Sequence, residues 1–153
     1  MPIFQAIAKQ WFYMGSSGSG TATKLVVNSL LGVGMQAIAE AVVLGERLDL
    51  SRTRLLDVLS HTAVVAPAFI NKLSRIGQNN FSPQFSLQMM NKDFELILQK
   101  ASSLGVAMPT TAAAYQINQQ ELTRKQDEDF SAVIRRVEEL SIKPVQTTLP
   151  SAP

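Results

Sequence analysis

Hydrophobic residues recur at helical spacing along nearly the whole chain. Over residues 21–47, Ala, Leu, Val, Met and Ile fall on more than one face of a helix, which predicts a helix packed on several sides. At 1.5 Å per residue this helix would be about 40 Å long, which is long for a chain of 153 residues. We therefore expect it to contact something outside the chain.

Capping and helix-breaking residues divide the remainder into shorter helices. Ser51 has the position of an N-cap, with Leu50 and Leu55 placed as a hydrophobic staple, and it opens a helix through Leu59. The other expected helices are bounded by proline, serine, aspartate or glycine and run over residues 67–77, 86–104, 109–125 and 129–140. The pattern predicts an all-α fold with one long N-terminal helix.

The two ends of the chain depart from this pattern. The run WFYM, residues 11–14, has the composition of a β-strand but no second strand to pair with. We therefore expect residues 1–14 to be the remnant of an interdomain strand or linker. The tail, residues 141–153, has little apolar content and is rich in proline, so we expect it to be disordered. The helical domain would then occupy residues 15–140.

Composition and charge narrow the function classes. The formal net charge is +2 with Lys and Arg scattered, so the basic stripe of a nucleic-acid-binding protein is missing. The chain has no cysteine, and its single histidine, His61, has no catalytic or metal-binding arrangement around it. The longest uncharged stretch, residues 25–39, is too short to span a membrane, and no signal-peptide pattern is visible. We expect a cytoplasmic protein without metal, nucleic-acid or membrane partners.

The run GSSGSGTATKLVVN, residues 15–28, admits three interpretations: a phosphate-binding loop, a flexible linker, or the entry to a helix that carries a reactive lysine. The P-loop requires a lysine directly after its last glycine, and the dinucleotide fingerprint has its glycines in another order, so neither nucleotide loop fits. Composition alone leaves the linker open. Lys24 and Asn28, however, stand four residues apart and project from one face of the helix start, which favours the reactive lysine.

Together with three later blocks, this run resembles the C-terminal domain of the β-hydroxyacid dehydrogenases, the group containing 3-hydroxyisobutyrate dehydrogenase and the glyoxylate/succinic semialdehyde reductases. The pattern G-x-x-G-x-G-x-x-x-K-x-x-x-N falls on residues 15–28, and the other blocks are FSPQFSLQMMNKDFELIL, ASSLGVAMP and the closing D-x-S-A at residues 129–132. The resemblance implies a helical domain like the C-terminal domain of 6-phosphogluconate dehydrogenase. It also implies that the NAD(P)-binding N-terminal Rossmann domain of the family is missing from this chain.

The same resemblance implies roles for individual residues. Lys24 would move a proton to or from the substrate oxygen while a nicotinamide, NAD or NADP, transfers hydride, and Asn28 would orient the substrate beside it. The residues implied to bind substrate or cofactor are Gly18, Gly20, Phe85 and Asp93 for the substrate and Lys92 for the cofactor. We expect Lys24 to be buried at the positive end of the helix dipole, because both effects favour the neutral amine.

Three functions remain open from the sequence. In the first, the chain is the catalytic-lysine, substrate-binding and dimerisation half of an NAD(P)-dependent 3-hydroxyacid dehydrogenase. It would form a homodimer and act with a Rossmann domain, in cis or in trans, on a small hydroxyacid or semialdehyde. In the second, it is a stand-alone helical association module without activity, and in the third it binds anions at the glycine-flanked helix start. The joint presence of Lys24 with Asn28 and of Lys92 with Asp93 favours the first.

Overall fold

The computed structural model describes residues 10–124 and 127–141. The helices within them are α2 (Ser19–Arg47), α3 (Arg52–Ser60), α4 (Pro67–Gly77), α5 (Leu87–Ser103), α6 (Pro109–Leu122) and α7 (Val133–Leu140), with a 3-10 turn, η1 (Phe130–Ala132), before α7. No strand occurs among these residues, only an isolated bridge between Ser86 and Asp129. The predicted all-α fold with a long N-terminal helix is confirmed.

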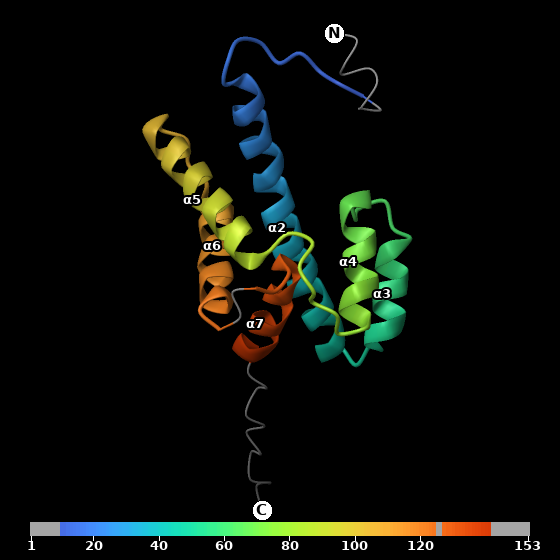
Figure 1. Cartoon of the computed structure of the whole chain (residues 1–153). Helices are drawn as coiled ribbons and strands as arrows, with labels where there is room; N and C mark the ends of the chain where they lie inside the picture. Colours follow the sequence, from blue (N-terminus) through green and yellow to red (C-terminus); the bar gives the residue numbers. More distant parts are fainter. Residues whose placement is uncertain (1–9, 125–126, 142–153) are drawn as a thin grey trace, which may run out of the picture.

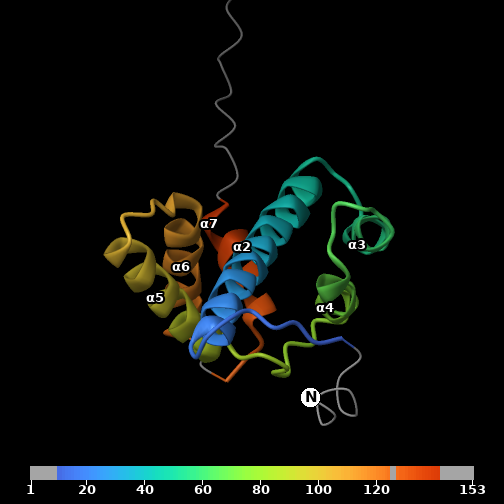
Figure 2. The same cartoon turned by 90° about the horizontal axis from the view of Figure 1, so that it is seen from above.

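Helix α2 is the centre of the molecule. Helices α5, α6 and α7 lie on one side of it and the α3–α4 hairpin lies on the other (Figure 1), and the view from above agrees (Figure 2). Its buried residues include Met35, Ala39 and Val42, none of which is exposed to solvent. The prediction that this helix packs on several sides is confirmed.

Two glycines of α2 allow neighbouring helices to approach it closely. A Cβ at Gly32 would lie 2.3 Å from Cζ of Phe94 in α5, and a Cβ at Gly34 would lie 2.7 Å from Cζ of Phe69 in α4. Positions two residues apart on an α-helix are separated by about 200° around its axis, so they point to opposite faces. The two sides of the bundle therefore meet α2 at the same level through glycine.

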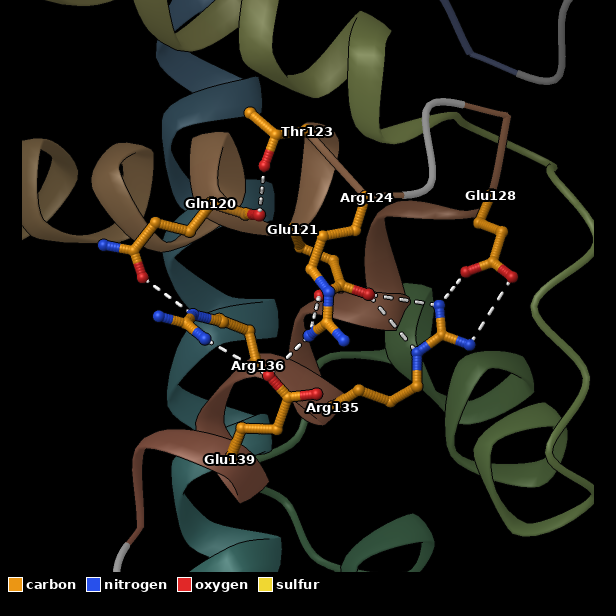
Figure 3. A network of polar contacts seen from close by, with 8 residues as sticks. All are labelled: Gln120, Glu121, Thr123, Arg124, Glu128, Arg135, Arg136 and Glu139. Atoms are coloured by element: carbon orange, nitrogen blue, oxygen red, sulfur yellow. Dashed lines mark hydrogen bonds and ion pairs between the residues drawn. The ribbon is translucent and has the colours of Figure 1, made fainter.

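Ion pairs fasten α7 to α6 (Figure 3). The side chain of Glu121 is only 2% exposed. Its carboxylate accepts hydrogen bonds from Nε and Nη2 of Arg135 at 3.3 and 3.2 Å. Arg135 also pairs with Glu128, and its guanidinium lies 4.5 Å from the ring centroid of Phe81. The outer members of this network are Gln120, Thr123, Arg124, Arg136 and Glu139.

Helix α2 is long enough and apolar enough to cross a membrane by length and composition alone, since an 18-residue window of it has a mean hydropathy of 1.6. The longest uncharged stretch of the sequence, residues 25–39, had indicated a segment too short to span a membrane. Of that window, 44% is buried inside the protein. This burial is typical of a helix at the centre of a bundle, where apolar residues are needed on several faces.

Three local expectations need correction or stay untested. Residues 11–14, which have the composition of a strand, are exposed and irregular, and no described strand lies beside them to pair with their backbone. Their interpretation as the remnant of an interdomain strand or linker stays a prediction. Ser51 does stand at the N-cap of α3, but its side chain makes no capping hydrogen bond. The expectations for residues 1–9 and 142–153 lie outside the described residues, so the domain boundaries remain predictions.

Candidate active site

The first turns of α2 carry Lys24 and Asn28. The helix begins after Gly18, whose φ of 94° lies in the left-handed region that glycine adopts without strain. Thr23 then donates from Oγ1 to the carbonyl of Ser19 at 2.8 Å, within the first turns. Since Lys24 and Asn28 are one turn apart, both side chains reach the same neighbour, helix α5.

That neighbour supplies Asp93, which joins the two. Nζ of Lys24 lies 3.0 Å from Oδ1 and 3.2 Å from Oδ2 of Asp93, and Nδ2 of Asn28 donates to Oδ2 at 2.6 Å. Asp93 and Asn28 are buried, with 4% and 9% of their surfaces exposed. The carboxylate is therefore held between an ammonium and an amide, which are the partners that a buried negative charge requires.

Lys24 itself is not buried. Its side chain is 57% exposed, against 6% for that of Asp93, so the expectation of a buried lysine is wrong for this chain. The N-terminal turns of α2 rise beyond the α3–α4 hairpin and run beside α5 (Figure 1), which leaves part of their surface uncovered. An ammonium has three N–H donors. Held by Asp93 on one side and open to solvent on the other, Lys24 can donate to an oxygen atom of a bound molecule.

The other predicted residues make no hydrogen bond or ion pair with this cluster in the part of the chain that the structure describes. A Cβ at Gly18 or Gly20 would meet no atom within 4 Å, so the helix start is an open surface. Phe85 is half-buried in the loop before α5, and its ring meets that of Phe130 edge to face with centroids 5.8 Å apart. Lys92 is exposed on α5 and forms no ion pair within the described part of the chain. The structure thus brings together Lys24, Asn28 and Asp93 alone.

A second buried ion pair was missed in the sequence. Nζ of Lys72 in α4 lies 2.5 Å from Oδ2 of Asp129, a residue with no exposed surface. Asp129 had been assigned only as a helix cap, and it does accept a hydrogen bond from the backbone N–H of Ser131 at 3.1 Å. The signal for Lys72 was its spacing, because it falls on the apolar face of α4 with Phe69, Leu73 and Ile76.

The environment of Asp129 shifts its pKa. Burial raises the pKa of this carboxyl, but hydrogen bonds from Lys72, from Ser131 and from the backbone of Gln84 outweigh burial and bring it below its ordinary value of 3.8. Asp129 is therefore held as a charged group inside the protein. Among residues 10–124 and 127–141 there is no group of three or more His, Cys, Asp or Glu side chains that could hold a metal ion.

The match with known proteins covers the helices and the site together. A family model described as the NAD-binding domain of NADP-dependent 3-hydroxyisobutyrate dehydrogenase matches residues 18–137. The chain belongs to this family. The match begins at the glycine before α2 and ends in α7, so it includes Lys24, Asn28 and Asp93.

Individual relatives agree with the family. Glyoxylate/succinic semialdehyde reductase 1 of Arabidopsis thaliana is 36% identical over 138 residues, which are 90% of this chain and 48% of the reductase. The crystal structure of 3-hydroxyisobutyrate dehydrogenase from Salmonella typhimurium is similar with a TM-score of 0.82 and 26% identity, over 88% of this chain and 48% of that one. The Mycobacterium tuberculosis 3-hydroxyisobutyrate dehydrogenase structure with L-serine gives a TM-score of 0.75 and 31% identity, over 89% and 49% of the two chains.

This member of the 3-hydroxyisobutyrate dehydrogenase family spans about half the length of the relatives it matches. The family model and the structural matches support the resemblance on which the site residues were first selected. The bonds of Asp93 to Lys24 and Asn28 are geometry that the sequence did not contain.

Proposed function

We propose that this chain is the catalytic-lysine, substrate-binding and dimerisation domain of an NAD(P)-dependent 3-hydroxyacid dehydrogenase. It would act with a Rossmann domain, present in cis or in trans, on a small 3-hydroxyacid or the corresponding semialdehyde. The observation that carries the proposal is the cluster of Lys24, Asn28 and Asp93, in which a buried carboxylate holds an exposed ammonium and a buried amide on one helix face.

The cluster suits proton transfer at an alcohol or carbonyl oxygen. In the reductive direction, a nicotinamide held by the Rossmann domain would supply hydride to the carbonyl carbon. Lys24 donates a proton to the oxygen as the C=O double bond becomes a C–O single bond, and the amine regains its proton from solvent. Asp93 keeps Nζ in place, while Asn28 has one amide N–H and its carbonyl oxygen beyond the bond to Asp93 with which to orient the substrate.

In this mechanism, the chain contributes Lys92 to cofactor binding, and the Rossmann domain contributes most of the other contacts. Lys92 is exposed on α5, one residue from Asp93, and its ammonium suits the phosphate or carboxamide groups of a dinucleotide arriving from a Rossmann domain. The open surface at Gly18 and Gly20 suits the approach of a second domain or a substrate. We make no choice between NAD and NADP, because the Rossmann domain reads the ribose of the cofactor.

The substrate class follows from the family. The relatives are named for glyoxylate and succinic semialdehyde reduction and for 3-hydroxyisobutyrate oxidation, and one solved structure is described with L-serine, whose hydroxyl is on C3. In 3-hydroxyisobutyrate and L-serine the carbon that bears the hydroxyl is joined to the carboxylate through the α-carbon, whereas glyoxylate carries its carbonyl directly on the carboxylate and succinic semialdehyde carries it beyond two methylene groups. We propose the first of these spacings for the substrate of this chain. We propose that Phe85, with Gly18 and Gly20, contributes to the pocket that accepts this group.

Exposed apolar residues support an association partner. Val26, Val27 and Leu30 of α2 are 65%, 55% and 72% exposed and lie within two turns of one another. We propose that a second copy of this chain and a Rossmann domain share this surface, giving a homodimer in solution. A cytoplasmic location is also proposed, and fluorescence microscopy of a tagged chain tests it.

Reconstitution tests the function. The purified chain is mixed with the Rossmann half of a related enzyme, and NAD(P)H absorbance is followed with 3-hydroxyacids and semialdehydes. Turnover is expected, and Lys24→Met in α2 should abolish it, whereas Lys100→Met, which removes an exposed lysine from the last turn of α5, should leave it unchanged. Light scattering reports whether the chain forms a dimer. Two halves that associate without any turnover would replace this proposal with the association module.

A further inference from the structure

The loop that carries Phe85 is docked on the segment before α7 by backbone hydrogen bonds. Asp129 N–H donates to the carbonyl of Phe81 at 2.8 Å and Phe130 N–H to that of Phe85 at 2.9 Å. In the other direction, Leu87 N–H donates to the carbonyl of Glu128 at 2.9 Å. Two segments more than forty residues apart in sequence are thus paired directly before α5 begins.

The Asp129 side chain adds to this pairing. Its Oδ2 accepts hydrogen bonds from the backbone N–H groups of Gln84 and Phe85, at 3.0 and 3.2 Å. Its Oδ1 accepts from the backbone N–H and the hydroxyl of Ser131, at 3.1 and 2.7 Å. One carboxylate therefore accepts hydrogen bonds from both paired segments. A neutral side chain of similar shape lacks the acceptor capacity for all of these donors.

Lys72 completes the arrangement from a third element. Its Nζ lies 2.5 Å from Oδ2 of Asp129 and 5.1 Å from the ring centroid of Phe130, the same ring on which Phe85 packs. Both members of the pair are buried, Lys72 with 7% of its surface exposed. Because a buried charge without its partner is strongly unfavourable, the ion pair of Lys72 with Asp129 stabilises the observed position of this loop.

The loop position decides where two site residues lie. Phe85 is bonded through its N–H to Asp129 and through its carbonyl to Phe130. Ser86 is the N-cap of α5, accepting a hydrogen bond from Met89 N–H at 3.2 Å. Asp93 follows on the same rigid helix, so the register in which α5 begins also sets the position of the carboxylate that holds Lys24.

From these contacts we infer that Asp129 and Lys72 are positioning residues, which fix Phe85 and the start of α5 and thereby set the width of the substrate pocket. This inference rests on the proposed function for the role of Phe85. Neither residue contacts the Lys24–Asp93 cluster through any hydrogen bond of the described chain, so they act through the loop alone.

Amide hydrogen exchange of the full chain tests the positioning without any turnover. In Lys72→Met and in Asp129→Asn, the N–H groups of Gln84 and Phe85 should exchange about tenfold faster than in the wild type, after correction for the change at Met35, a core residue of α2 that reports global opening. Arg52→Met, which removes a half-buried ion pair to Glu138 on another face, is the control and should show no such excess. Unprotected Gln84 and Phe85 amides in the wild type, or equal acceleration at Met35, would overturn the inference.

Kinetics of the reconstituted enzyme provide the second test. Lys72→Met should raise KM for the substrate by about tenfold while changing kcat by less than about threefold, because Phe85 loses its fixed position whereas Asp93 keeps its hydrogen bonds to Lys24 and Asn28 of α2. The relative preference for substrates with larger side chains should rise as well. An unchanged KM in Lys72→Met would overturn the inference. The same rise in KM in the Arg52→Met control would also overturn it. A wild-type chain without turnover would remove the proposed function, and the exchange experiment would still decide whether this pair positions the loop.

Discussion

Asp93 and Lys24 form one ion pair with two very different environments. Nζ of Lys24 is 3.0 Å from Oδ1 of Asp93, but the lysine side chain is 57% exposed and the aspartate side chain 6%. The aspartate is consequently the structural member, with Asn28 as its buried partner, and the lysine is the member that a ligand can reach.

The two members should respond differently to substitution. Lys24→Met leaves the carboxylate of Asp93, 6% exposed, with only the amide of Asn28 as its partner and should lower the free energy of unfolding by about 3–5 kcal/mol. Asp93→Ala removes the buried charge itself, leaves Asn28 buried without its acceptor and should cost about 1–3 kcal/mol. Urea unfolding followed by circular dichroism measures both, and a larger loss for Asp93→Ala than for Lys24→Met would contradict this expectation.

Gly32 is predicted to be essential for the contact of α2 with α5. A Cβ there would lie 2.3 Å from Cζ and 2.6 Å from Cε1 of Phe94, a ring that is itself fully buried. Gly32→Ala should destabilise the protein by about 1–3 kcal/mol through overpacking. Gly20→Ala, where a Cβ meets nothing within 4 Å, is the matched control and should leave the melting temperature unchanged or slightly raised. Equal melting temperatures for the two variants would show that Phe94 moves aside at no cost.

Acid should act on the protein partly through Asp129. The pKa of this carboxyl is lowered in the folded state from its ordinary value of 3.8, with Lys72 as the charged group within hydrogen-bond distance. Its contribution to stability is therefore fully present above about pH 4 and is lost as the pH falls through the folded-state pKa. We expect the free energy of unfolding to fall with pH below about pH 4 more steeply in the wild type than in Asp129→Asn. Urea titrations at a series of pH values test this, and parallel slopes would be the contrary result.

The ion pairs between α6 and α7 should differ in strength according to burial. Arg135→Met leaves the carboxylate of Glu121, 2% exposed, without its main partner, and should cost about 3–5 kcal/mol. Arg124→Met removes a half-exposed arginine from Glu139 on the rim of the same network and should cost much less than Arg135→Met, because both groups of this pair are in contact with solvent. The double variant Glu121→Leu with Arg135→Met should recover most of the loss. Thermal unfolding of the four proteins checks the order, which would be refuted if the double variant were less stable than Arg135→Met.

The sequence was sufficient for the helices because their ends are encoded locally. Pro67 and Gly77 bound α4 as expected, and α5 begins after Ser86, whose side chain caps it. Residues 11–14 have the composition of a strand but form none, since strand formation depends on a partner that the described residues do not contain. The length of the uncharged stretch and the mean hydropathy of α2 differ as criteria for a membrane span, and the central position of α2 (Figure 1) explains why it is apolar on several faces.

The site was predictable in its members and not in its geometry. The resemblance to the family selected Lys24, Asn28 and Asp93, and helix periodicity placed the first two on one face. Periodicity does not reveal that Asp93 reaches across from α5, because that contact joins residues 69 positions apart. Lys72 was missed for the same reason, as its partner is 57 residues away. Tertiary contacts between charged residues leave little trace in local patterns.

The N-terminal turns of α2 project past the bundle and are secured there by a residue far along the chain. Asp93 holds Lys24 and Asn28 from α5, while the turns before them are mostly exposed. Helix ends fray readily when nothing packs on them. Fraying of α2 from Ser19 as far as Asn28 would dismantle the cluster while the bundle around Met35 stayed folded. Any ligand that bridges Lys24 and Asn28 therefore also stabilises the N-terminal turns of this helix. Occupancy of the site and helical order at residues 19–28 should rise and fall together.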